Sequence, residues 1–194
     1  MRRFNVILLA LTMLFSLGLF AEEEESQESG PVQAIQSAIV KLNQLTTAAA
    51  YSPQMMNFLV DKEISPMFDF EHIANEVLLV TNNSLSQDEV RFFSGKLKKN
   101  IISTLLTRLS QANSTSFQFI SARPVMGGSI AVQLRVNGYS SYPIYIDLLF
   151  HQNKEENWQI FDIVLNNDSL TNYYQKMVLI KARRYGIYGM LGRI

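Results

Sequence analysis

The 194-residue sequence contains no cysteine and only two histidines, His72 and His151. Without cysteine the chain has no disulfides, no thiol nucleophile and no zinc site built on thiolates. The two histidines stand in unrelated sequence contexts, so neither a catalytic triad nor a histidine-based metal site is predicted. The glycine-rich phosphate loop, the G-x-S-x-G motif and the H-E-x-x-H motif are also missing. We therefore predict no catalytic residue, no metal ligand and no cofactor.

Neither sign of charge is in excess, because 17 Lys and Arg residues balance 17 Asp and Glu residues. The distribution is uneven, since five of the acidic side chains fall within residues 22–28. The remaining chain from residue 32 onward carries 15 basic and 12 acidic side chains. This small positive excess forms no basic stripe, so a nucleic-acid partner is not predicted.

The long hydrophobic run of the sequence lies at the N-terminus. Arg2 and Arg3 precede an apolar stretch over residues 6–20, and Ala21 is followed by four glutamates. This layout is typical of a cleavable signal peptide, with cleavage after Ala21 or, less favourably, after Gly18. A membrane anchor would need about 20 apolar residues, and no basic cluster follows this shorter run. We predict a signal peptide at 1–21, an acidic disordered leader at 22–31 and one domain at 32–194.

Hydrophobic periodicity predicts helices in the first half of the domain. Apolar residues at spacings of three and four predict helices over residues 32–50, from Ser52 to Pro66 and over residues 70–78. Ser86 and Glu89 form a capping-box pattern, which predicts that a long helix begins there and extends to about Gln111.

After residue 116 the apolar period falls to two, which predicts four strands, at residues 117–123, 130–136, 142–150 and 158–165. Residues 166–168 are a predicted turn, and Ser169 can cap a last helix that extends to about Arg184, with a short helical piece after Gly186. This order predicts an α+β fold in which helices pack on a curved four-stranded antiparallel sheet connected as a meander.

Two carboxylates, Asp147 and Asp162, interrupt otherwise apolar strands. A buried carboxylate is costly unless it is hydrogen-bonded or paired. One of them could serve as a general base in an apolar pocket, as in ketosteroid isomerase. The favoured interpretation is structural: each accepts hydrogen bonds from backbone N–H groups or from Arg123, Arg135 or Tyr145.

Two stretches of the domain carry a wider pattern. The first has the sequence FLVDKEISPMFD over residues 58–69 and continues as IANEVLL over residues 73–79. The second has YIDL over residues 145–148, NWQIFDI over 157–163, the Ser169-capped helix and RYGIYGML over 184–191. This pattern resembles the MlaC family of periplasmic phospholipid-binding proteins, also called the toluene-tolerance family. The sequence departs from it at residues 166–168, where Glu-Gly-Val is usual, and at Tyr174, where arginine is common.

The resemblance implies a periplasmic carrier with an NTF2-like arrangement that encloses an apolar lipid pocket. We expect it to be a monomer, although the sequence leaves the oligomeric state open. The acyl chains of one glycerophospholipid would lie in this pocket as cargo, with the headgroup near solvent. The resemblance also implies exchange with an outer-membrane lipoprotein complex and with an inner-membrane ABC transporter bearing an MCE-domain subunit. Such exchange would maintain outer-membrane lipid asymmetry without any covalent step.

The predicted pocket residues are inward-facing apolar positions of the third helix, the long helix and the sheet, any of which could instead be ordinary core. They are Phe70, Ile73, Val77, Phe93, Leu97, Ile101, Leu105, Val132, Leu134, Ile146, Leu148 and Ile163.

The residues leave two other functions open: a pocket enzyme with an aspartate base, and a non-catalytic adaptor of the cell envelope. A basic set near the C-terminus could meet phosphate or an acidic partner, or could be a solvated helix face with favourable helix-dipole charges. This set comprises Lys181, Arg183, Arg184 and Arg193.

Overall fold

The computed structural model describes residues 30–49, 52–111, 116–138 and 142–194. The predicted signal peptide and most of the acidic leader lie outside these residues. In the first half the helices are α2 (Pro31–Ala49), α3 (Pro53–Leu59), the π-helix η1 (Val60–Ile64), η2 (Ser65–Met67), α4 (Phe70–Leu78), η3 (Leu79–Thr81) and α5 (Gln87–Gln111). The second half contains β1 (Ser116–Pro124), η4 (Met126–Gly128), β2 (Ile130–Asn137), β3 (Ile144–Gln152), β4 (Trp158–Leu165), β5 (Asp168–Ser169) and α6 (Leu170–Leu191).

The sheet is an antiparallel meander in the order β1-β2-β3-β4-β5. The predicted α+β class and its four strands are confirmed. The sheet gains a fifth strand because Asn166 and Asn167 form the expected turn with positive φ angles, after which Asp168 returns to pair with Leu165. Irregularities in the β1–β2 and β3–β4 registers mark bulges, which increase the local twist of the sheet.

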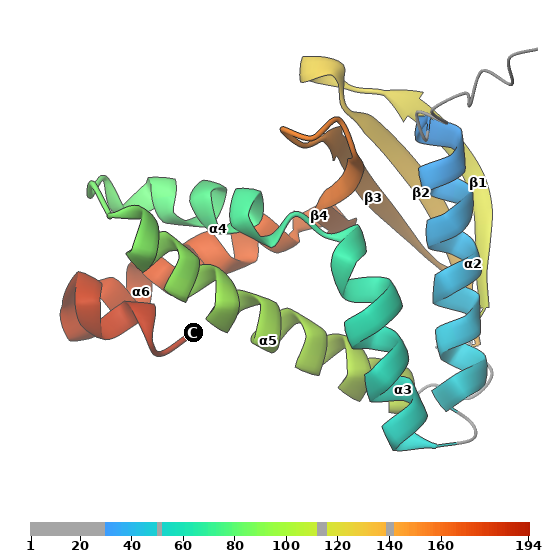
Figure 1. The fold of residues 1–194 in the computed structure, drawn as a ribbon, viewed down its shortest axis with the longest axis horizontal. Helices are drawn as coiled ribbons and strands as arrows, with labels where there is room; N and C mark the ends of the chain where they lie inside the picture. The colour runs from blue at the N-terminus through green and yellow to red at the C-terminus, as the bar shows by residue number, and fades with distance from the viewer. Residues whose placement is uncertain (1–29, 50–51, 112–115, 139–141) are drawn as a thin grey trace, which may run out of the picture.

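The helices form two groups around the sheet (Figure 1). Helix α2 lies along one face of the sheet and contacts β1. The Asn43 side chain fixes this contact, because Nδ2 donates to the Phe117 carbonyl at 3.0 Å and Oδ1 accepts the Phe117 N–H at 2.8 Å. Helices α4, α5 and α6 pack on one another, and α4 and α6 also contact β4. Apolar side chains from both groups join those of the sheet in one continuous core.

The predicted helix starts are confirmed. The Ser86 backbone N–H donates to Glu89 Oε2 at 2.7 Å, and Ser86 Oγ accepts the Glu89 N–H at 3.3 Å, which completes the capping box of α5. Ser52 caps α3 and Ser169 caps α6. Gly186, with φ 72° and ψ 170°, interrupts α6 where the separate C-terminal helical piece was expected.

The predicted helix from Ser52 to Pro66 is wrong in its second half. The α-helix ends at Leu59 and continues as the π-helix η1 and then the 3-10 turn η2. Val60 and Ile64, four residues apart in η1, are both fully buried in the core. An apolar spacing of four is also that of an α-helix, so the sequence period does not distinguish the two forms. No helix in the four described ranges combines the length and the apolar character needed to cross a bilayer.

Candidate functional site

The twelve predicted pocket residues all belong to the continuous core. Nine are buried, while Leu105, Ile146 and Ile163 are half-buried and pack against the others. Helices α4 and α5 and strands β2, β3 and β4 thus place these side chains in one apolar interior. Their role as lipid contacts stays a prediction.

A cleft of about 340 Å³ opens between η1 and α5. Its walls are formed by Asp61 of η1 and by Gly95, Lys98, Lys99, Ile102 and Ser103 of α5. Ile102 is only 7 % exposed and belongs to the core, so the cleft has an apolar side chain at its base. Lys98 Nζ lies 5.8 Å from the ring centre of Phe70, a predicted pocket residue. The cleft therefore borders the apolar interior.

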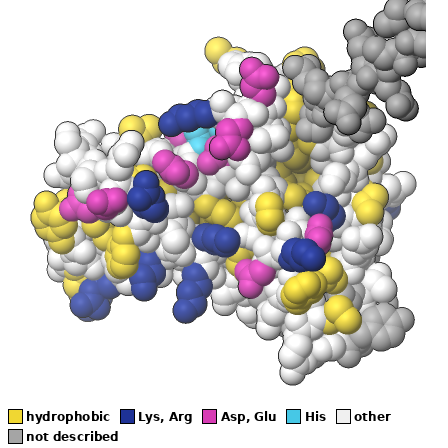
Figure 2. Space-filling view, viewed as in Figure 1, with side chains coloured by type: hydrophobic (Ala, Val, Ile, Leu, Met, Phe, Trp, Pro, Cys, Tyr) yellow, Lys and Arg dark blue, Asp and Glu magenta, His cyan; other side chains and the backbone are white. Residues whose placement is uncertain are grey.

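The charged groups of this cleft have no charged partner within the four described ranges. Among the residues that the structure describes, Asp61, Lys98 and Lys99 form neither an ion pair nor a side-chain hydrogen bond. In Figure 2, other basic side chains gather along the lower edge of the half of the molecule that contains α4, α5 and α6. Apolar side chains are visible between this half and the half that contains the sheet and α2. The cleft thus combines two cationic groups, one anionic group and an apolar floor.

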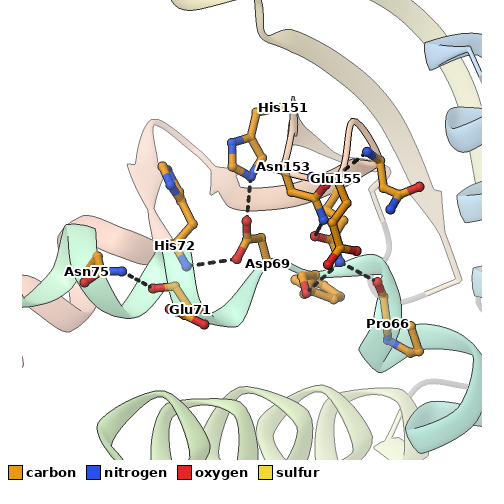
Figure 3. A network of polar contacts seen from close by, with 11 residues as sticks. Pro66, Asp69, Glu71, His72, Asn75, His151, Asn153 and Glu155 are labelled. Atoms are coloured by element: carbon orange, nitrogen blue, oxygen red, sulfur yellow. Dashed lines mark hydrogen bonds and ion pairs between the residues drawn. The ribbon is translucent and has the colours of Figure 1, made fainter. Parts of the chain in front are cut away.

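A second, polar hollow of about 380 Å³ lies where α4 begins against the β3–β4 hairpin (Figure 3). Asp69 caps α4, because its Oδ1 accepts the His72 N–H at 2.9 Å. Asp69 Oδ2 lies 3.1 Å from His151 Nε2. The rings of His72 and His151 are 4.4 Å apart, and both contact the ring of Phe161. Sequence contexts alone did not indicate this pairing of the two histidines.

Further hydrogen bonds fasten the same segment to β4. The Asp69 N–H donates to the Ile160 carbonyl at 3.0 Å, and Gln159 Nε2 donates to the Pro66 carbonyl at 2.9 Å. We call Asp69, His72, His151 and Gln159 the α4–β4 joint. Burial, and then the neighbouring His72, lower the pKa of His151 below its ordinary value of 6.5, while Asp69 opposes this shift. The joint therefore holds His151 neutral near pH 7 between two elements of the fold.

Asp162 and Asp147 both accept hydrogen bonds, as the structural interpretation predicts. Asp162 Oδ1 accepts the N–H groups of Ile163 at 2.9 Å and Thr171 at 3.1 Å, and its Oδ2 accepts the Ser169 hydroxyl at 2.6 Å. This buried carboxylate ties β4 to the start of α6.

Asp147 has different partners. It accepts from Gln133 Nε2 at 3.2 Å and pairs with Arg123 Nη2 at 3.4 Å. Arg123 was among its expected donors, whereas Gln133 was not. Among the described residues, no group of three potential metal ligands stands close together.

Comparison with known protein families identifies the family of this chain. The family model for MlaC protein matches residues 32–193. The chain belongs to the MlaC family. A solved structure with the same fold is the phospholipid-binding protein from Ralstonia solanacearum in complex with a phospholipid, which is 16% identical, with a TM-score of 0.64. The match covers 82% of this chain and 89% of that chain. No curated protein matched the chain significantly.

Tyr174 is one of the positions that depart from the expected MlaC pattern, and the structure shows the contacts of this residue. Tyr174 of α6 is buried, and its hydroxyl donates to Asn100 Oδ1 of α5 at 2.7 Å. Burial, with a smaller contribution from Tyr173, raises the pKa of Tyr174 to about 12. The neutral hydroxyl thus serves as a link between two helices of this MlaC-family chain.

Of the basic C-terminal set, Lys181, Arg183 and Arg184 lie on α6, and Arg193 follows the end of that helix. Arg184 and Arg193 stack over the ring of Tyr185, at 5.2 and 4.8 Å from its centre. Lys181 donates to the Arg193 carbonyl, and Arg183 is exposed. Three of the four residues therefore make contacts within the C-terminal segment of this MlaC-family chain.

Proposed function

We propose that this chain is a carrier of glycerophospholipids. Its membership of the MlaC family carries the proposal, and the shared fold of a protein solved with a phospholipid supports it. Each methylene transferred from water into an apolar site is worth about 0.8 kcal/mol, so a two-chain lipid needs a protein cover to cross water. A carrier makes and breaks no bond, and the hydrogen-bonded Asp147 and Asp162 are assigned no catalytic role.

The lipid chains would occupy the apolar interior lined by the twelve predicted residues. These side chains already share one cluster that joins the sheet to α4 and α5. Loading would insert acyl chains between the helices and the sheet and replace contacts among these side chains. Residues such as Ile146 and Ile163, which are only half-buried, would exchange protein contacts for lipid contacts at the smallest cost.

The cellular setting follows from the N-terminal sequence and from family membership. We infer export through the signal peptide at residues 1–21 and work in the periplasm as a monomer. The carrier would exchange phospholipid with an outer-membrane lipoprotein complex and an inner-membrane ABC transporter bearing an MCE-domain subunit. Removal or delivery of phospholipid by this route would maintain outer-membrane lipid asymmetry.

Native mass spectrometry tests the proposal directly. The full chain is expressed in a bacterium with two membranes and purified from the envelope fraction. We expect a mass increment of one intact diacyl phospholipid per chain. Lipid-free preparations that also take up none from vesicles would contradict the carrier function.

A matched pair of variants on β4 locates the cargo. Ile163→Trp enlarges a half-buried side chain that packs against the apolar cluster, whereas Leu165→Trp changes an exposed side chain on the same strand. We expect Ile163→Trp to lower lipid occupancy and Leu165→Trp to leave it unchanged. Equal occupancy in the two variants would remove Ile163 from the proposed pocket.

A further inference from the structure

We propose that the cleft between η1 and α5 binds the headgroup of a zwitterionic glycerophospholipid. Lys98 and Lys99 would bind the phosphodiester, and Asp61 would face the ammonium group. This inference rests on the proposed carrier function, and it adds a headgroup class and a location for it.

The first argument is the contrast between the charges of the cleft and other charges of the chain. Lys41 pairs with Glu63 at 3.2 Å, although it belongs to the same neighbourhood of α2 and η1. Asp61, two residues before Glu63, has no ion pair among the described residues, nor do Lys98 and Lys99 across the cleft. Groups that stay unpaired on two facing walls are free to receive a ligand with both signs of charge. A phosphate and an ammonium group in one molecule match this arrangement.

The second argument is the position of the cleft beside the apolar interior. Ile102 belongs to the core, and Leu97 and Ile101 of the predicted pocket lie on the same helix. Lys98 spans from the cleft to the ring of Phe70, another pocket residue. A ligand with a charged head and apolar chains would therefore meet charge at the rim and apolar surface below it. An inorganic anion would use only the rim.

The third argument is the π-helical form of the η1 wall and the glycine in the α5 wall. The η1 wall is a π-helix, a rare form that often marks functional segments. In the α5 wall, Gly95 occupies a helix interior, where glycine costs about 1 kcal/mol relative to alanine. No heavy atom lies within 4 Å of the place where a Gly95 side chain would begin, so tight packing does not require glycine there. Gly95 leaves the α5 wall of the cleft without a side chain at this position.

The test compares the loading of purified full chain from vesicles of dioleoyl phosphatidylcholine, dioleoyl phosphatidylglycerol or dioleoylglycerol. We expect the wild-type chain to load phosphatidylcholine best and dioleoylglycerol, which lacks the phosphate, least. Lys98→Gln with Lys99→Gln should weaken phosphatidylcholine loading about five- to ten-fold, the range expected for losing two exposed charge contacts. Asp61→Asn should shift the preference toward the anionic phosphatidylglycerol.

Two control variants accompany the test. Lys96→Gln removes a positive charge from the same helix outside the cleft lining and should load as wild type. Lys98→Arg with Lys99→Arg keeps both charges and should retain loading, which separates the loss of charge from any disturbance of α5. Far-ultraviolet circular dichroism verifies that each variant is folded.

The outcomes separate the two proposals. If the wild-type chain loads no lipid of any kind, the carrier function fails. If it loads lipid and the double glutamine variant behaves like Lys96→Gln, the headgroup inference is overturned while the carrier function stands. Inorganic phosphate should not compete with vesicle loading at equal concentration, because it lacks the apolar chains. Competition by phosphate would identify a general anion site and would also overturn the inference.

Discussion

The α4–β4 joint and the cleft between η1 and α5 use similar polar side chains in opposite ways. In the joint, Asp69 bonds to both the His72 backbone and the His151 ring. In the cleft, Asp61 and its facing lysines have no ion pair among the described residues. Polar groups that bond to one another hold elements of the fold together. Charged groups that remain without such partners above an apolar floor are available to a ligand.

The largest expected effect on stability is at Asp162, a polar group that holds elements of the fold together. Asp162→Ala leaves three donors without their acceptor in a buried setting, so we expect the free energy of unfolding to fall by about 3 kcal/mol. Asp147→Ala on the neighbouring strand loses a partly exposed ion pair, and should cost about 1 kcal/mol or less. Urea denaturation measures both values. Equal losses would contradict the structural role assigned to Asp162.

A smaller difference in the free energy of unfolding is expected between variants of the α4–β4 joint and variants of the cleft. Asp69→Ala removes the cap of α4 and the partner of His151, and should lower the free energy of unfolding by about 1–2 kcal/mol. Asp61→Ala should change it by less than about 0.5 kcal/mol, because this exposed carboxylate has no ion pair in the described structure. If Asp61→Ala were as destabilising as Asp69→Ala, the cleft would be structural rather than a binding site.

Acidification should reduce the contribution of the α4–β4 joint to stability in a defined pH range. Because burial lowers the pKa of folded His151 below 6.5, the unfolded chain takes up its proton first as pH falls. The contribution of His151 is thus complete above pH 6.5 and decreases as pH falls from 6.5 through the lower pKa of the folded state. His151→Gln should flatten the pH dependence of the free energy of unfolding in this window. If the free energy of unfolding of this variant depended on pH as that of the wild type does, the titration of His151 would not contribute to the stability of the joint.

The smallest expected effect is at Gly95, where a substitution should change stability and phospholipid loading in opposite directions. Gly95→Ala should raise the free energy of unfolding by up to about 1 kcal/mol, because alanine favours the helix and its Cβ meets no neighbour. The added methyl group narrows the cleft, so phospholipid loading should decrease. Ser94→Ala, one position earlier in α5, is the control and should leave loading unchanged. An increase in both stability and loading would argue against a ligand in the cleft.

Local sequence signals predicted much of the fold. The Ser86–Glu89 box, the Ser52 and Ser169 caps and the break at Gly186 depend on neighbouring residues, and the structure confirms each. Alternating apolar residues likewise predicted the four long strands. These features were predictable because their interactions are close in sequence.

The polar sites depend on packing between distant segments. Asp69 precedes an apolar-periodic run, which is a recognisable helix-cap signal, but its bond to His151 requires α4 to meet the β3–β4 hairpin. The cleft forms only when η1 lies opposite α5, and the spacing of Val60 and Ile64 does not distinguish the π-helix η1 from an α-helix. No local pattern in the sequence contains this information.

Transfer of phospholipid between two vesicle populations tests the central claim most directly. Donor vesicles carry a fluorescent phosphatidylcholine, acceptor vesicles carry none, and the purified full chain is added in increasing amounts. The account predicts a transfer rate that rises in proportion to protein concentration, with the lipid recovered intact. A rate equal to that of vesicles without protein, or recovery of hydrolysed lipid, would contradict a non-catalytic phospholipid carrier.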